Sequence, residues 1–334
     1  MRIIAEPIST LEDLERARAG WRSLWRRIPA PSVFQSPDWL IPWWRHFAPG
    51  QLTSIALWRG EDLAGIAPLY CEECSRRLLP LGISLSDCLD VLIEEESSGS
   101  VQRAMEAEIA RITGCAEICF PDVAPNASVL SLTLPGFSAR RDAGQTSPEL
   151  ILGPAGNPLA NVPAHQRQNL RTAENRARRR GCMTGDLTAE DLPRLLPALM
   201  QLHSARQRHL GRDGLGGDGR VLAFFTEAFT ALAHEGVVRA YLMACEARPI
   251  GFYLGFLYSG RASYYFGGFD PEFAFESPGT ILIGHAMRCA AAEGARIFDF
   301  LRGAEPYKYA WGARDRPLLS LSFARQCSDV ELAS

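Results

Sequence analysis

Three consecutive strand-like runs joined by very short connections constrain the fold of this chain most strongly. The runs cover residues 237–245, 250–258 and 261–269, and only a few residues separate each from the next. Connections this short join antiparallel neighbours and cannot form a parallel crossover. A helix is predicted next over 278–293, followed by a buried strand over 296–300. The second half therefore predicts an antiparallel meander, then a helix and a strand.

The first half shows a similar order of elements in a weaker form. In chain order, the sequence predicts helices at 11–27 and 38–47, a hairpin of 52–58 with 63–70 and a short strand at 78–81. A third helix at 101–112 and a buried strand at 116–120 follow. Glycine and proline concentrate at 151–158, which is the predicted linker. We therefore expect a mixed α/β (α+β) protein with domains at 1–155 and 156–334. Each domain should have a mostly antiparallel sheet flanked by helices.

Composition excludes several classes of protein. The 334 residues are 47% hydrophobic and 22% charged, so the chain can bury a core and is not disordered. The net charge of −3 argues against a nucleic-acid binder held by bulk electrostatics. No long apolar run predicts a signal peptide or membrane-spanning helix, and the nine cysteines have no disulfide-like spacing, so we expect a cytoplasmic protein. Cys71-Glu72-Glu73-Cys74 lacks a second ligand pair, so no metal is expected.

Ser277-Pro278-Gly279-Thr280 opens the helix predicted after the meander. Serine suits the N-cap and proline the first helical position, while glycine leaves the backbone open to an approaching group. Amide N–H groups at a helix start attract a pyrophosphate. Ser277, Gly279 and Thr280 are therefore candidate cofactor-binding residues, with an ordinary capped helix as the alternative.

A second cluster follows the buried strand at 296–300. Asp299, Arg302, Glu305 and Lys308 place acids and cations within ten residues, and Lys308 is the sole lysine in the chain. Such a loop could supply a general base and a group that binds an anion. The alternative is an internal network of ion pairs that braces the loop.

Two further features lie between the predicted linker and the meander. The predicted helix 163–180 carries an apolar stripe and six arginines against one acid: Arg167, Arg171, Arg176, Arg178, Arg179 and Arg180. This face is either solvated or contacts an anionic partner, which could be RNA, an anionic lipid surface or a polyanionic substrate. His203 is either a base or a structural histidine, and the glycine-rich segment 211–219 could close over a substrate.

Residues 165–315 resemble the acyltransferase domain of the CelD/BcsL-type family. This family belongs to the GNAT superfamily and is related to the Fem-type aminoacyl transferases. The likeness rests on the arginine-rich helix, on the strand ending Tyr264-Tyr265-Phe266-Gly267-Gly268-Phe269-Asp270-Pro271, on Ser277-Pro278-Gly279, and on Asp299-Phe300-Leu301-Arg302-Gly303 with Glu305, Tyr307 and Lys308. Phe34-Gln35-Ser36-Pro37-Asp38-Trp39 and Ala67-Pro68-Leu69 extend it into the first half.

The resemblance implies tandem GNAT-like domains and transfer of an acyl group from acyl-CoA, such as acetyl-CoA, to an amine or hydroxyl. It also implies a setting in polysaccharide (cellulose) or cell-envelope synthesis. By position, Ser277, Gly279 and Thr280 would hold the pyrophosphate. We expect Glu305, Asp299 or a water that they position to deprotonate the acceptor, and Lys308 or Arg302 to bind an anionic group. An aminoacyl-tRNA-dependent transferase and a non-catalytic accessory protein of polysaccharide assembly remain alternatives.

Overall fold

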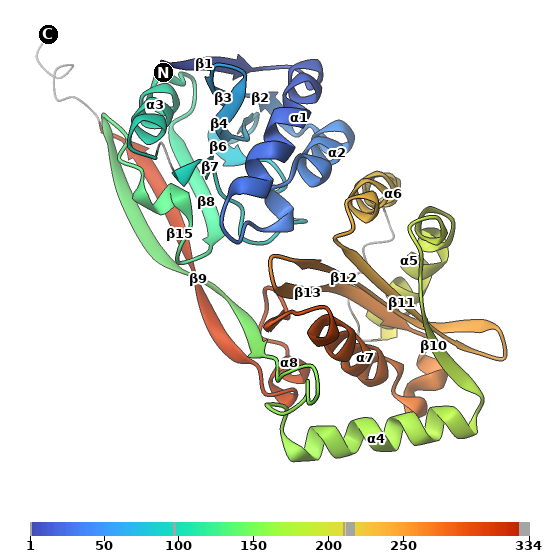
Figure 1. Ribbon diagram of the computed structural model, residues 1–334. Coiled ribbons are helices and arrows are strands. Elements are labelled where there is room, and N and C mark those ends of the chain that lie inside the picture. The colour runs from blue at the N-terminus through green and yellow to red at the C-terminus, as the bar shows by residue number, and fades with distance from the viewer. Residues whose placement is uncertain (1, 96–97, 210, 212–217, 327–334) are drawn as a thin grey trace, which may run out of the picture. The chain divides into compact units, whose positions relative to one another are not determined.

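The computed structural model describes residues 2–95, 98–209, 211 and 218–326. The chain forms two compact units (Figure 1). Unit 1 comprises residues 1–145 and 317–334, and unit 2 comprises residues 146–316. The predicted boundary after residue 155 lies inside unit 2, and the return of the chain to unit 1 near its end was not predicted.

Unit 1 contains two sheets and three α-helices among its described residues. Its elements are β1 (Ile3–Ile8), α1 (Leu11–Arg27), α2 (Pro37–Phe47), β2 (Gly50–Leu52), β3 (Ser54–Arg59), β4 (Asp62–Ala67), β5 (Leu69–Glu72), β6 (Arg77–Pro80), β7 (Leu92–Ile93), α3 (Ser98–Arg111) and β8 (Glu117–Val123). One sheet has the order β1-β3-β4-β7, and in the other β15 (Arg314–Arg325) pairs with β8, followed by β6, β5 and β2.

The hairpin predicted in unit 1 is divided between these two sheets. β3 pairs with β4, whereas β2 pairs with β5. The break falls at Thr53 and Pro68, and proline cannot donate to a strand ladder. Each of the two predicted strands therefore becomes two short ones.

Unit 2 contains the predicted meander, helix and strand. Its elements are α4 (Ala164–Arg179), β10 (Cys182–Asp186), α5 (Asp191–His209), α6 (Gly219–His234), β11 (Val238–Cys245), β12 (Arg248–Tyr258), β13 (Arg261–Phe269), the short 3₁₀ helix η5 (Pro271–Glu276), α7 (Pro278–Ala292), β14 (Ile297–Asp299) and α8 (Pro306–Ala310). Its sheet has the order β10-β11-β12-β13-β14-β9, where β9 is Phe137–Ile151. The segment 151–158, predicted as a linker, lies inside this unit.

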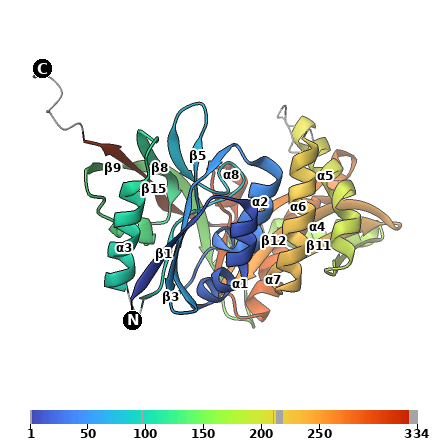
Figure 2. The ribbon, with the colours of Figure 1, turned by 90° about the horizontal axis from the view of Figure 1, so that it is seen from above.

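Helices cover both faces of the sheet of unit 2 (Figures 1 and 2). On one face α5 and α6 enclose an aromatic core in which Phe225 and Phe229 contact Phe266. On the other face α7 and α4 pack through Leu282 and Leu170, among other buried apolar side chains. The mixed α/β class is thus confirmed. Both units also share one order of elements: a strand, two helices, antiparallel strands, a helix and a strand.

Two disulfides join cysteines far apart in the sequence. Cys71 is bonded to Cys115 in unit 1, and Cys182 is bonded to Cys245 between β10 and β11. Spacing along the chain did not predict either pair. Cysteines 182 and 245 are directly opposite each other in the strand register, which only the fold determines.

Candidate active site

The sheet of unit 2 opens where β13 and β14 separate. These parallel strands pair only over Arg261–Ser263 and Ile297–Asp299. β13 then continues to Phe269 and leads into α7, whereas β14 ends at Asp299 and leads to α8. Ligands of α/β sheets bind at the carboxyl ends of such strands, where their connections diverge. The polar residues that follow the two strands are therefore the candidate site.

A β-bulge lies in β13 beside this opening. Leu254 pairs with Phe266 and Gly255 with Tyr264, so Tyr265 is one residue more than the opposite strand provides. A bulge bends its strand and changes the direction of nearby side chains. Here both Tyr265 and Phe266 contact Phe225 of α6.

The start of α7 offers fewer free amides than the sequence predicted. The Ser277 N–H donates to Ala274 O (3.1 Å) and the Thr280 N–H donates to Ser277 O (3.0 Å). Ser277 has a φ of 55° and its side chain makes no capping hydrogen bond. Within the described residues the Gly279 N–H has no partner. Ser277 and Thr280 are therefore occupied, and Gly279 alone of the three predicted residues presents an open amide.

Arg206 and Gly279 both border the ring of Phe269. The guanidinium carbon of Arg206 lies 4.5 Å from the centroid of the Phe269 ring. The same ring borders Gly279, where an added Cβ would lie 3.6 Å from it. Among the described residues Arg206 makes no ion pair. The sequence analysis did not select it, although it follows His203 by three positions and so shares its side of α5.

His203 lies buried on α5 and contacts β13. Its Nδ1 is 2.9 Å from the Gly267 carbonyl oxygen, which can only accept, so Nδ1 carries the proton of the neutral ring. Burial lowers the pKa of this imidazole below its usual value. The helix approaches β13 this closely because Gly268 has no side chain: a Cβ there would lie 2.6 Å from the His203 Cα. His203 is therefore a neutral imidazole whose Nε2 can accept a proton.

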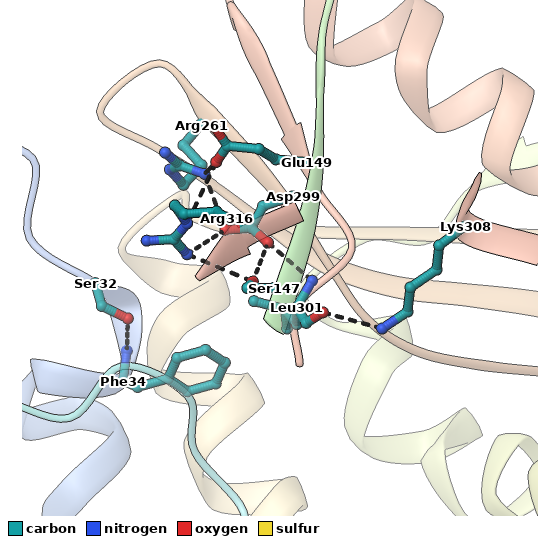
Figure 3. A network of polar contacts seen from close by, with 9 residues as sticks. All are labelled: Ser32, Phe34, Ser147, Glu149, Arg261, Asp299, Leu301, Lys308 and Arg316. Carbon is teal, nitrogen blue, oxygen red and sulfur yellow. Dashed lines mark hydrogen bonds and ion pairs between the residues drawn. The ribbon is translucent and has the colours of Figure 1, made fainter. Parts of the chain in front are cut away.

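Asp299 is enclosed by hydrogen-bond donors (Figure 3). Oδ1 accepts from Ser147 Oγ (2.9 Å) and Leu301 N–H (2.8 Å), while Oδ2 accepts from Arg261 (2.9 Å) and Arg316 (3.1 Å). Both arginines also contact Glu149. Only 2% of Asp299 is exposed. Structural partners occupy both oxygens of Asp299, which favours the ion-pair network over the predicted catalytic base.

Lys308 is equally enclosed. Its Nζ donates to the carbonyl oxygens of Leu301 (2.9 Å), Arg302 (2.6 Å) and Gly303 (3.0 Å), and lies 2.9 Å from Glu305 Oε2. Only 2% of the residue is exposed. An ammonium has three donors, so none remains for a phosphate or an oxyanion. The contacts of Lys308 therefore favour the loop-bracing alternative over the predicted binding of an anion. At Arg302 the structure shows the main-chain carbonyl held by Lys308.

Glu305 differs from these two residues because 38% of its side chain is exposed. Its carboxylate also borders Gly303, where a Cβ would lie 2.6 Å from Oε2. Burial raises the pKa of the Tyr264 and Tyr307 phenols, and the negative charge of Glu305 adds to this effect. Of the two carboxylates predicted as bases, Glu305 is the accessible one. Residues 212–217 of the predicted closing loop lie outside the described residues.

Both the sequence and the fold of this chain resemble those of known proteins. Residues 164–309 match a family model described as acetyltransferase (GNAT) domain. The crystal structure of FemX superposes with a TM-score of 0.67 at 13% identity, over 98% of each chain. The C-terminal domain of a protein assigned as a lysylphosphatidylglycerol synthetase from Agrobacterium fabrum has a TM-score of 0.58 at 14% identity, over 95% of this chain and 92% of that one. No curated protein matches.

The matched residues 164–309 lie wholly within unit 2. Over nearly its whole length, the chain has the fold of FemX. The domain match supports a transferase, and GNAT domains in general use acyl-CoA. Among the described residues, none of the helices has the length and apolarity needed to cross a bilayer.

Proposed function

We propose that unit 2 transfers an acyl group from acyl-CoA, with acetyl-CoA as the simplest donor, to an amine or hydroxyl acceptor. The observation that carries this proposal is the open Gly279 amide at the start of α7, together with the Arg206 guanidinium on the Phe269 ring that also borders Gly279; among the described residues Arg206 makes no ion pair. An amide at a helix N-terminus and a nearby cation both favour phosphate groups. The match of this segment to a GNAT domain supports CoA as the carrier of those phosphates.

In the proposed reaction the acceptor attacks the thioester carbonyl while a neutral imidazole removes its proton. His203 Nε2 receives that proton, and the hydrogen bond from Nδ1 to Gly267 O keeps the ring in the required tautomer. Collapse of the tetrahedral intermediate breaks the C–S bond, and the same proton passes to the departing thiolate. The products are the acylated acceptor and free CoA. Glu305, which is partly exposed, is the second candidate for the base.

The donor site is tested by placing a negative charge at Gly279. Gly279→Asp should weaken acetyl-CoA binding at least tenfold in calorimetric titration, because the carboxylate repels the phosphates and occupies the open helix end. An acid in the first helical turn stabilises the helix by about 0.3–1 kcal/mol, so unfolding would not explain the loss. Gly279→Asn, which has the same size without the charge, is the control. Equal affinities of the Asp and Asn variants would contradict this donor site.

The base is tested by His203→Asn. The amide of asparagine can still donate to Gly267 O, whereas the basic nitrogen is lost. We expect kcat/KM to fall about 100-fold with little change in the free energy of unfolding. Since the neutral imidazole is the active form and burial lowers its pKa, wild-type activity should be constant near neutral pH and fall only under more acidic conditions. The variant should lack that acidic limb.

Glu305→Gln serves as the comparison for this experiment. A normal rate in His203→Asn together with a large loss in Glu305→Gln would transfer the role of base to Glu305. Normal rates in both variants would exclude both residues.

The class of acceptor and the identity of the donor are proposed from the family resemblance. The CelD/BcsL-type likeness of the segments around Ser277 and Asp299 supports an acceptor from polysaccharide or cell-envelope synthesis. An aminoacyl-tRNA donor is the second candidate, favoured by the likeness of the whole chain to FemX. Mass spectrometry of molecules that co-purify with the native protein distinguishes the two donors, since one predicts bound CoA and the other predicts bound tRNA.

A further inference from the structure

Three exposed arginines of α4 have no ion-pair partner within the described part of the chain. The helix packs against unit 2 through a buried stripe formed by Gln166, Leu170, Ala173 and Ala177. Arg171, Arg178 and Arg179 are exposed on other sides of the helix. Within the described residues none of the three makes an ion pair or a hydrogen bond. Figure 1 shows α4 along the outer edge of unit 2, where one long side is not covered by other elements of that unit.

Nearby acids do not cancel this charge, because each already has a cation of its own. Glu174, the one acid in α4, lies 2.6 Å from Arg288 of α7. Glu276 is buried and lies 2.8 Å from Arg180. Elsewhere on the surface, arginines are commonly paired: Arg140 lies 2.8 Å from Asp142. The unpaired arginines of α4 therefore form a local positive region on a chain with a net charge of −3.

An exposed aromatic ring lies beside Arg176, a further arginine of α4. Phe275 of η5 is 69% exposed, and the guanidinium carbon of Arg176 lies 4.5 Å from its ring centroid. η5 packs directly on α4. We call Arg171, Arg176, Arg178, Arg179 and Phe275 together the α4 arginine face. An exposed apolar side chain among cations is the combination found in proteins that bind at a membrane interface.

A cavity of about 390 Å³ adjoins this face between α4 and α7. Arg178, His285 and Arg288 supply polar groups to its lining, as does Glu174, which is paired with Arg288. Met243 and Ile281 supply apolar surface. A lining with both characters suits an amphiphile with an anionic end. The same surface argues against RNA as the partner. Binding a strand of RNA would need further cations along the path of the strand and aromatic rings with free faces on which bases stack. Phe275 has one face covered by Arg176.

We propose that the α4 arginine face docks this protein on an anionic lipid surface. Its arginines contact lipid phosphates, and Phe275 enters the interfacial layer. Each arginine near an anionic membrane contributes about 1 kcal/mol, which is a factor of about five in binding. This docking is independent of the acyl donor and of the base proposed above.

The test is sedimentation of the full-length protein with vesicles of phosphatidylcholine, with and without phosphatidylglycerol as a third of the lipid. Binding should require phosphatidylglycerol and weaken as salt is added. Replacing Arg171, Arg178 and Arg179 together with glutamine should reduce binding at least tenfold. Phe275→Ala should reduce it severalfold at unchanged net charge.

The matched control replaces Arg111, Arg140 and Arg194 with glutamine. These arginines are as exposed and change the net charge equally, but each is paired with an acid of its own. This control should bind vesicles like the parent. Equal losses in both triple variants, or no binding to phosphatidylglycerol vesicles, would overturn the proposal. Tight binding to a mixed tRNA probe that the α4 variant alone loses, without vesicle binding, would assign the face to RNA instead.

Discussion

Replacing Asp299 with alanine will lower the free energy of unfolding by about 3–5 kcal/mol, the usual effect of breaking a buried ion pair. Arg261 and Arg316 would lose a shared carboxylate oxygen, and the Ser147 hydroxyl and Leu301 N–H would lose their acceptor. Urea denaturation followed by circular dichroism measures the change. Asp299→Asn should be intermediate, because it keeps an acceptor for Ser147 and Leu301 but no longer compensates the two guanidinium charges.

The same variants separate a structural role from a catalytic one. If Asp299 only braces the loop, total activity should fall with the folded fraction and recover partly at lower temperature, while activity per folded molecule stays close to that of the parent. An Asp299→Asn protein with parental stability and no activity would contradict the network as the reason for this residue. That outcome would restore Asp299 as a catalytic group.

The Asp299 network shows why the sequence could identify polar residues here but not their roles. Asp299 and Lys308 stand out within a short segment that follows a predicted strand. The partners that decide what they do come from distant parts of the chain: Ser147 is 152 residues from Asp299, and Arg261 is 38 residues away. Sequence periodicity carries no information about such pairings, so a catalytic carboxylate and a structural carboxylate have the same local sequence pattern.

The fold was predictable where local signals are strong. The meander, α7 and β14 have apolar runs, short turns and a Ser-Pro-Gly helix start, and their observed bounds lie close to the predicted ones. β9 was missed because most of its residues are exposed and polar, which removes the alternation that marks a strand. Since β9 and β15 are the two strands that span the division between the units, the domain boundary was misplaced as well.

The arginine-rich helix is an intermediate case. Its amphipathic pattern correctly predicted α4, and the excess of arginine indicated an anionic partner. The local sequence does not predict which arginines form ion pairs. Arg180 pairs with Glu276, 96 residues later, whereas Arg178 and Arg179 make no ion pair among the described residues. The inference about membranes therefore depends on tertiary pairing, which distinguishes these arginines from other surface cations.

Lys308→Met will destabilise the protein by about 3 kcal/mol, since three carbonyl oxygens and Glu305 lose a buried cation. Lys308→Arg should also be destabilising, by about 1–3 kcal/mol, because a planar guanidinium cannot direct three N–H groups at carbonyls that converge on one point. This geometry explains a lysine in a chain whose other long cations are all arginine. The loop needs this lysine because Leu301 and Gly303 have positive φ values of 59° and 104°. This conformation costs free energy at Leu301 and persists only when the surrounding structure holds it.

Urea denaturation of the two variants beside the exposed control Arg194→Lys measures the difference in the free energy of unfolding. Parental stability of Lys308→Arg would contradict the three-carbonyl explanation. A stable Lys308→Met protein with weakened acetyl-CoA binding would instead make Lys308 an anion-binding residue.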